Sequence, residues 1–257
     1  LNELKAAVAM QGEVQEASMG RIAKAAKKFE KITLGGYGEL HYQDIEKDSG
    51  SDSRSMDAHR YVLFFGYDFT DKVRFRSEFE LEHGLVADTA DGSNGGEVEL
   101  EQMYIEMDHT DNLTSRVGVM LIPVGILNEN HEPPTFYGVE RNEVEKYILP
   151  TTWWGGGAQL VYKMNNGVTL EAMVHEGLAV DTDTGYIRGG RQKSANAVAN
   201  DWAYTLRATY TGFPGLKASV FFNHQTDATA SSGDNLEELD IMGASAIYGF
   251  GDGFEVR

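Results

Sequence analysis

Carboxylate and imidazole side chains are the residues of this sequence whose types and spacing could support chemistry. Glu78, Glu80 and Glu82 recur at every second position, so in an extended strand they share one face and could act as paired acids. His131 and Glu132 are adjacent and could both bind a metal ion, but no further ligand follows at a spacing typical of metal sites. We therefore interpret this pair as part of a loop hydrogen-bond network and expect no metal and no other cofactor.

The remaining histidines are widely separated, and we expect each to lie singly at a strand position or a strand end: His41, His59, His83, His109, His175 and His224. No HExxH, GxSxG or P-loop motif occurs. The acidic segment 88–97 could bind calcium, but it lacks the EF-hand spacing. These observations predict a protein that is not an enzyme, and a charged, water-filled interior explains the row of glutamates more simply than catalysis does.

The elements that carry these residues show a repeat of two. The stretch VRFRSEFELEH (73–83) alternates apolar and polar residues almost without error, as a β-strand with one apolar and one polar face does. Similar patterns across 32–257 predict about eleven strands, the last beginning near Phe254. The phase slips near Gln102, which indicates a β-bulge. The predicted fold class is therefore all-β with antiparallel strands.

Strand length and loop rhythm distinguish between a protein core and lipid as the environment of the apolar face. Short turns at 70–72, 110–112, 165–167, 211–215 and 251–253 alternate with long polar loops, as in transmembrane barrels. The strands run about nine to thirteen residues, close to the ~9–11 that cross a bilayer on a tilt, and aromatic residues gather near their ends. We predict a transmembrane antiparallel β-barrel. The alternative is a soluble all-β binding or carbohydrate-active protein.

Composition narrows the possible partners. The 257 residues carry 40 acidic and 22 basic side chains, a formal net charge of -18, which argues against nucleic acid as a partner. No run approaches the ~20 apolar residues of a membrane-spanning helix, and the lack of cysteine fits an exported and a cytosolic protein equally. Because the sequence starts at Leu1 without an initiator methionine and stops within a predicted strand, we expect it to be part of a longer chain.

Residues 1–31 differ from the rest. They lack proline, are rich in alanine and strong helix formers, and place mostly apolar residues at heptad positions a and d. A short coiled coil and an amphipathic helix lying on the remainder of the protein both fit this pattern. We therefore predict a helical periplasmic leader at 1–31 and a barrel domain at 32–257.

In a barrel, the polar face of each strand lines a water-filled channel. The predicted pore-lining residues are Glu39, Arg74, Arg76, Glu78, Glu80, Glu82, Arg116, Lys163, Glu171 and Arg207. Mixed charges on a pore wall influence ion selectivity. At any single position, however, a solvated side chain without a role in selectivity is the simpler interpretation.

The segment 123–157 has no alternation and includes two of the three tryptophans; a loop of this length in a compact fold is usually functional. The run GVMLIPVGILNENHEPPTFYGVERNEVEKYILPTTWW resembles the signature loop of outer-membrane porins of the phosphate-selective porin O and P family. The resemblance covers the leader through at least Val174, and the remainder matches by pattern only.

The resemblance implies a sixteen-stranded, trimeric barrel in the outer membrane of a Gram-negative bacterium, in contact with the lipid bilayer and lipopolysaccharide. Such a porin is a passive channel for small ions and hydrophilic solutes, narrowed by this loop, which folds inward. The implied constriction residues are Asn128, Glu129, His131, Glu132, Tyr137, Glu140, Arg141 and Asn142. Trp153 and Trp154 would anchor the loop's return at the membrane interface.

Phosphate selectivity is not carried over with the resemblance. Anion channels present rings of arginine and lysine, whereas residues 128–146 contain five glutamates against Arg141 and Lys146. We therefore expect a weak preference for cations, or none. A barrel that serves as an assembly or adhesion scaffold is a third interpretation that the sequence does not separate from a channel.

Overall fold

The computed structural model describes residues 19, 28–84, 86, 95–138, 140–199, 201–229, 238–251 and 253–257. Nearly all of the expected helical leader at 1–31 lies outside these residues, so its coiled coil remains a prediction. Within the described ranges, no helix combines the length and apolar character needed to cross a membrane.

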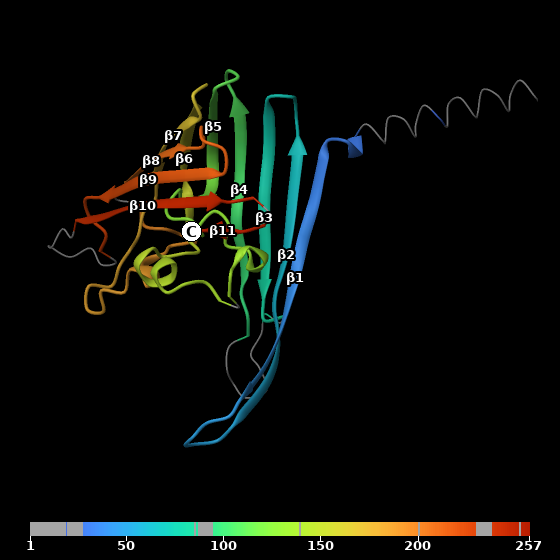
Figure 1. Cartoon of the computed structure of the whole chain (residues 1–257), viewed down its shortest axis with the longest axis vertical. Helices are drawn as coiled ribbons and strands as arrows, with labels where there is room; N and C mark the ends of the chain where they lie inside the picture. Colours follow the sequence, from blue (N-terminus) through green and yellow to red (C-terminus); the bar gives the residue numbers. More distant parts are fainter. Residues whose placement is uncertain are drawn as a thin grey trace, which may run out of the picture.

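Eleven strands form one antiparallel sheet in which each strand pairs with its neighbours in sequence (Figure 1). They are β1 (Ile32–Ile45), β2 (Ser53–Asp68), β3 (Val73–Glu82), β4 (Val98–Asp108), β5 (Leu113–Leu121), β6 (Trp154–Lys163), β7 (Val168–His175), β8 (Ala203–Tyr210), β9 (Leu216–Gln225), β10 (Leu239–Gly249) and β11 (Glu255–Val256). Three short helical turns lie between strands: η1 (Pro133–Thr135), η2 (Val144–Ile148) and η3 (Ile187–Gly190). The predicted all-β class and the alternation of short turns with long connections are confirmed.

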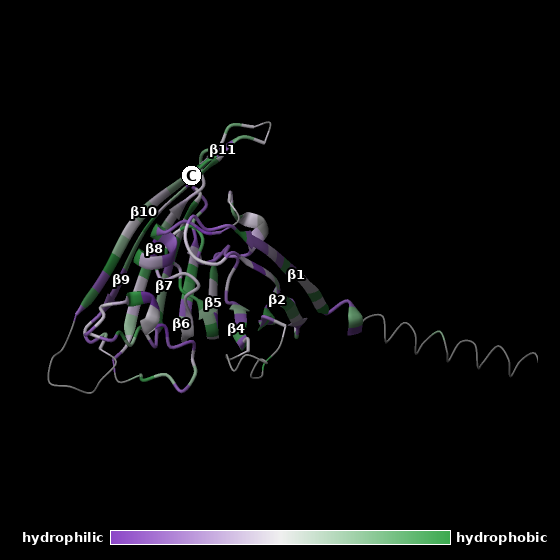
Figure 2. Ribbon diagram, turned by 90° about the horizontal axis from the view of Figure 1, so that it is seen from below, coloured by the Kyte–Doolittle hydropathy of each residue, from purple (hydrophilic) through white to green (hydrophobic). Residues whose placement is uncertain are grey.

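The sheet is strongly curved, and Figure 2 shows the strands following one another around an arc with β1 and β10 at its two ends. Among the described residues, β1 pairs only with β2, and β11 pairs only with β10. The closed sixteen-stranded barrel implied by the resemblance therefore remains a prediction.

The two faces of the sheet differ in chemistry because the strands alternate as expected. On the convex face, large apolar side chains are exposed from β1 to β10: Leu34, Leu40, Tyr61, Phe65, Phe79, Leu100, Met103, Val117, Leu160, Tyr162, Leu170, Tyr204, Leu206, Tyr210, Val220, Phe222 and Met242. The concave face carries charged and amide side chains, many of them buried, such as Glu80, Gln159 and Asn223. This is the reverse of a soluble protein, in which apolar side chains fill the interior.

Two register shifts change the alternation locally. In the β3–β4 pairing, Glu78 faces Gln102 but Phe79 faces Leu100, so the bulge expected near Gln102 is confirmed. A second shift occurs in the β1–β2 pairing, where Glu39 faces Arg60 but His41 faces Asp57. Each bulge brings an additional side chain onto one face of its strand.

Two boundaries differ from the sequence-based expectation. The β1–β2 hairpin runs on through Ile45 and Ser53, in a segment we expected to be a loop because it is rich in aspartate and serine. Strand β6 begins at Trp154 and includes the three glycines at 155–157, so the long connection covers 122–153 rather than 123–157. In both places, cross-strand pairing outweighs weak local β-propensity.

Candidate functional site

The candidate site is the concave face of the sheet together with the long connection 122–153, which we call the inner loop. The inner loop contacts strands far apart in the sheet. Its Glu129 forms an ion pair with Arg207 of β8, whereas its His131 contacts Glu101 of β4. The inner loop therefore bridges the concave face from β4 to β8.

We call the concave face of the sheet the wall, and the part of it near the short turns carries a network of paired charges. Arg74 of β3 contacts Glu106 at 2.8 Å and Asp108 at 2.7 Å. Arg116 of β5 reaches the other oxygen of Glu106 at 2.7 Å and also donates a hydrogen bond to Gln159 at 3.2 Å. These contacts place the predicted pore-lining residues Arg74 and Arg116 on the concave face and neutralise much of their charge.

The other predicted pore-lining residues also lie on this face or at its rim. Arg76 pairs with Asp68 at 2.8 Å, and Arg207 contacts Glu171 at 2.5 Å as well as Glu129 of the inner loop. Lys163 is exposed beside the short turns, in a pocket that Arg74 and Arg116 also line. Glu82 is partly buried at the end of β3.

Three glutamates lie buried where the inner loop covers β3 and β4. Glu78 accepts a hydrogen bond from Gln102 at 2.5 Å, Glu80 lies 3.3 Å from Arg60, and Glu101 contacts His131. Arg60 also contacts Glu39 at 2.8 Å. Because burying an unpaired carboxylate is costly, these partners explain how the glutamates are accommodated. Their burial does not support the paired-acid chemistry that we considered for the row at 78–82.

Asn128 is wholly buried and holds the two ends of the inner loop together. Its side-chain nitrogen donates to the carbonyl oxygens of Ile122 at 2.7 Å and Trp153 at 2.8 Å, and its oxygen accepts from the Trp153 amide at 2.7 Å. We expected Asn128 on the polar surface of the constriction. This expectation is wrong, because the side chain satisfies three backbone groups that burial would otherwise leave unpaired.

His131 is likewise buried and anchors the inner loop to the wall. Nδ1 lies 2.9 Å from the carbonyl oxygen of Asn128, and Nε2 lies 2.7 Å from Glu101 Oε2. Burial lowers the pKa of His131, but the hydrogen bond and charge of Glu101 outweigh it and raise the pKa to about 9. His131 is therefore an imidazolium anchor at neutral pH. We expected His131 on the polar surface of the constriction, but it lies buried beneath that surface. Its partner Glu101 could not be recognised from the residues next to it in the sequence.

The two tryptophans at the end of the inner loop point inward. Trp153 belongs to an apolar cluster with Ile122, Val124, Met173, Phe221 and Ile241 among others, and its ring meets His175 edge-on at 5.3 Å. Trp154 is buried under Lys193, whose Nζ lies 5.3 Å from the ring centre. The expectation of an interfacial anchor is wrong, because both rings find contacts inside the curve of the sheet.

Three arginines lie close enough for their charges to act on one another: Arg141 of the inner loop, Arg188 of η3, and Arg191. We call them the arginine group. Within the described chain, Nη1 of Arg141 and Nη1 of Arg188 are buried without a hydrogen-bond partner. Burial and then the charge of Arg191 lower the pKa of Arg188 to about 10. Burial and then the charges of Arg188 and Arg60 also lower the pKa of Arg141, so positive charge is crowded at this point.

The remaining predicted constriction residues lie on more open parts of the loop. Tyr137 is exposed and donates a hydrogen bond to Glu255 at 2.7 Å. Asn142 accepts the amide of Glu145 at 2.9 Å. Glu140 is exposed and Glu132 is partly buried. Glu145, which we did not single out, is buried and accepts the amides of Ile126 and Leu127.

The structure also brings together histidines that we expected to lie singly. His41 and His59 come from β1 and β2, and His83 directly follows β3. The ring of His59 contacts both of the others, stacking on His41 and meeting His83 edge-on. The expectation is wrong for these three because the strands that carry them are neighbours in the sheet. Only their positions opposite one another in the register, which the sequence did not disclose, could have revealed the contact.

No protein-family model matches the chain. A protein of Aquifex aeolicus (strain VF5), described as uncharacterized, is 35% identical over 199 residues, which is 76% of this chain and 44% of that protein. The chain therefore spans less than half the length of that relative.

Several solved outer-membrane proteins superpose weakly. Pseudomonas putida OprB, in a high-pH structure, has a TM-score of 0.47 and 13% identity, covering 86% of this chain and 62% of that one. In-vitro folded OmpT, an outer membrane protein of Vibrio cholerae, has a TM-score of 0.43 and 12% identity, covering 85% and 57%. The trimer form of OmpT has a TM-score of 0.42 and 9% identity, covering 87% and 74%.

Proposed function

We propose that the chain forms the wall and constriction of a passive channel in a bacterial outer membrane. The observation that carries this proposal is the reversal of the two faces. Large apolar side chains such as Leu160, Leu206 and Phe222 are exposed on the convex face, while the ion-paired residues occupy the concave face. In water an exposed apolar surface of this extent is unfavourable, but in a bilayer it is the lipid-facing surface of a barrel.

The inner loop supplies the narrowing that such a channel needs. It crosses the concave face from Glu101 of β4 to Arg207 of β8, so a solute passing along the sheet must pass beside it. The loop is held at fixed points by Asn128 and His131, which makes a static constriction rather than a mobile flap. A porin of the phosphate-selective porin O and P type, with a homotrimeric assembly in contact with lipopolysaccharide, is consistent with this arrangement and belongs to the same proposal.

We expect small anions to be favoured beside the arginine group. Counting charges along 128–146 suggested a weak preference for cations, but that count treats every carboxylate as free. Glu129 is paired with Arg207, and Glu145 binds backbone amides. The guanidinium groups of Arg141 and Arg188, by contrast, each retain an unpartnered nitrogen among the described residues, and fixed positive charge at a constriction attracts anions.

Planar-bilayer recording of the full-length protein, refolded in detergent, tests the proposal. The expected result is a stable conductance step, with a reversal potential in a salt gradient that moves toward cation preference in Arg141→Gln. Arg54→Gln is the matched control, because Arg54 forms an exposed ion pair with Asp44 at the far end of the β1–β2 hairpin. A correctly folded protein that gives no conductance would exclude the channel, and a protein that stays monodisperse without detergent would favour the soluble alternative.

A further inference from the structure

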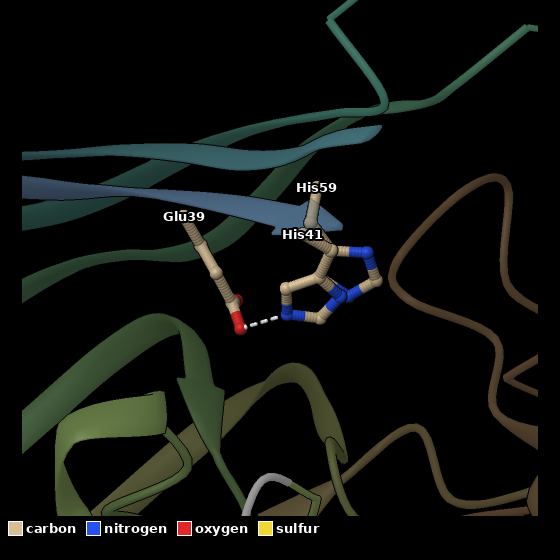
Figure 3. Close-up of side chains that lie close together, drawn as sticks. All are labelled: Glu39, His41 and His59. Carbon is tan, nitrogen blue, oxygen red and sulfur yellow. Dashed lines mark hydrogen bonds and ion pairs between the residues drawn. The ribbon is translucent and has the colours of Figure 1, made fainter. Parts of the chain in front are cut away.

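We infer that Glu39, His41 and His59 form a binding site for a divalent transition-metal ion of the Zn²⁺ class on the concave face. Figure 3 shows the three side chains close together, with those of His41 and Glu39 joined by a hydrogen bond. The site lies on β1 and β2 and uses no residue of the arginine group or of the inner-loop anchor. It therefore stands or falls independently of the proposed channel.

The backbone explains why these side chains converge. Glu39 and His41 are two residues apart in β1 and share its concave face. Across the pair, Glu39 faces Arg60 while His41 faces Asp57, so residues 58 and 59 stand opposite the single residue Leu40. This bulge lets the consecutive residues His59 and Arg60 both address the concave face, which places His59 beside His41.

The donor atoms suit a transition-metal ion. Nε2 of His41 lies 2.5 Å from Oε1 of Glu39, and the His41 and His59 rings stack with centroids 4.2 Å apart and planes inclined by 14°. One ligand atom from each of the three residues lies within 4.8 Å of the others. Two imidazoles and one carboxylate form a ligand set typical of zinc and related ions, with a fourth position open to water. Two stacked rings in the neutral form can share one metal ion, whereas two imidazolium rings at this distance would repel each other.

Asp57 provides a second observation that points to a metal. Its carboxylate lies 3.0 Å from Nδ1 of His59 and 2.9 Å from Nδ1 of His83. An Nδ1–H donated to a carboxylate fixes the tautomer in which Nε2 carries the lone pair, and this arrangement orients metal-binding histidines in many sites. Within the described ranges, Nε2 of His59 has no hydrogen-bond partner, so it is available for coordination. Arg60, at 2.8 Å, holds the other oxygen of Glu39 in place.

Three other groups of possible ligands are less suited. Asp57, His59 and His83 form one of them, but Nδ1 of each histidine is already hydrogen-bonded to Asp57, and His83 is exposed. Glu78, Glu101 and His131 are buried, and both nitrogens of His131 are already engaged by Glu101 and Asn128. The group at His224, Glu238 and Asp240 offers one imidazole and is more exposed. By contrast, the side chains of Glu39, His41 and His59 are 16%, 17% and 25% exposed. They are buried enough to be held in position by their neighbours, yet an ion can still reach them.

Calorimetric titration of the untagged, detergent-folded chain with Zn²⁺ tests the inference. We expect one Zn²⁺ per chain, and Asp57→Asn to weaken its binding about 10- to 100-fold, as loss of a carboxylate behind a ligating histidine does. His41→Gln and His59→Gln should weaken binding at least as much. His224→Gln is the matched control and should leave the affinity unchanged, because it removes the competing exposed group.

Cu²⁺ electron paramagnetic resonance on the unmodified protein provides a readout that does not depend on the folding of variants. Splitting from two imidazole nitrogens in the wild-type spectrum supports the site. Its loss in His59→Gln and its retention in His224→Gln then assign the nitrogens. The inference is overturned if the wild-type chain binds no Zn²⁺, if binding is unchanged in His41→Gln and His59→Gln, or if the copper spectrum shows no nitrogen ligand.

Discussion

Raising the pH should release the inner loop from the wall, because its anchor is a charged histidine. His131 is buried between the Asn128 carbonyl and Glu101, and only the imidazolium can donate to both. Once the ring loses a proton, one of the two acceptors loses its donor. His131 in a detached loop would return to the ordinary pKa of about 6.5.

The size of the effect follows from the pKa of about 9. Because the attached-state pKa is raised, the stabilisation is fully present below about pH 6.5 and is lost as the pH rises through about 9. The full value is about 3 kcal/mol, at 1.36 kcal/mol for each pH unit between the two values. Between pH 7 and pH 10, roughly 2.5 kcal/mol is lost, which increases the detached population about 70-fold.

A spin label on the inner loop measures this directly, since the chain contains no cysteine and Glu140 is exposed. A label on Glu140→Cys should become more mobile between pH 7 and pH 10. When His131→Gln is added to the labelled chain, the label should be mobile already at pH 7 and should show no further step near pH 9. When His109→Gln is added instead, as a control, the label should respond to pH as it does in the labelled chain that keeps both histidines. Equal mobility at both pH values, or the same step in His131→Gln, would refute the reasoning.

Three further predictions concern the loop, the lipid-facing surface and the paired charges. Asn128→Ala removes three buried hydrogen bonds and should lower the free energy of unfolding by about 2–4 kcal/mol, measured by urea unfolding, with the exposed Asn142→Ala changing it far less. Leu206→Arg on the convex face should cost about 2–4 kcal/mol in vesicles if it lies near the bilayer centre, whereas Lys217→Arg on β9 should be neutral; equal effects would contradict the assignment of the faces. Arg207→Gln leaves Glu171 and Glu129 without their guanidinium partner and should shift the reversal potential toward cation preference, an outcome that Arg76→Gln, at a more exposed pair, should reproduce only weakly.

The alternation of apolar and polar residues along the sequence predicted most of the strands correctly. Val73, Phe75 and Phe79 lie in β3 as expected, and the slip near Gln102 is a real bulge. Such features are local, because the period of a strand is two residues. The extension of β1 and β2 past the expected loop was missed because serine and aspartate are poor strand formers. Pairing with the opposite strand decides the structure there.

The contacts that define the site could not be predicted, because they depend on register and loop path. His131 and Glu101 are 30 residues apart, and nothing in either neighbourhood marks the other as its partner. Trp153 was expected at an interface because tryptophan is common there, but the curvature of the sheet provides an inner apolar cluster instead. His41 and His59 meet only because of a bulge whose position the polar hairpin did not show.

The apolar cluster beneath the inner loop also constrains the order of assembly. Each strand can add to its predecessor by a short-range pairing, but Ile122 and Trp153 share their cluster with Phe221 of β9 and Ile241 of β10. Contacts so distant in sequence form late, since closing long stretches of chain is entropically costly. The inner loop precedes those strands along the chain, so we expect it to reach its final position only after β9 and β10 have paired. The narrowing of the interior would then follow the pairing of these strands.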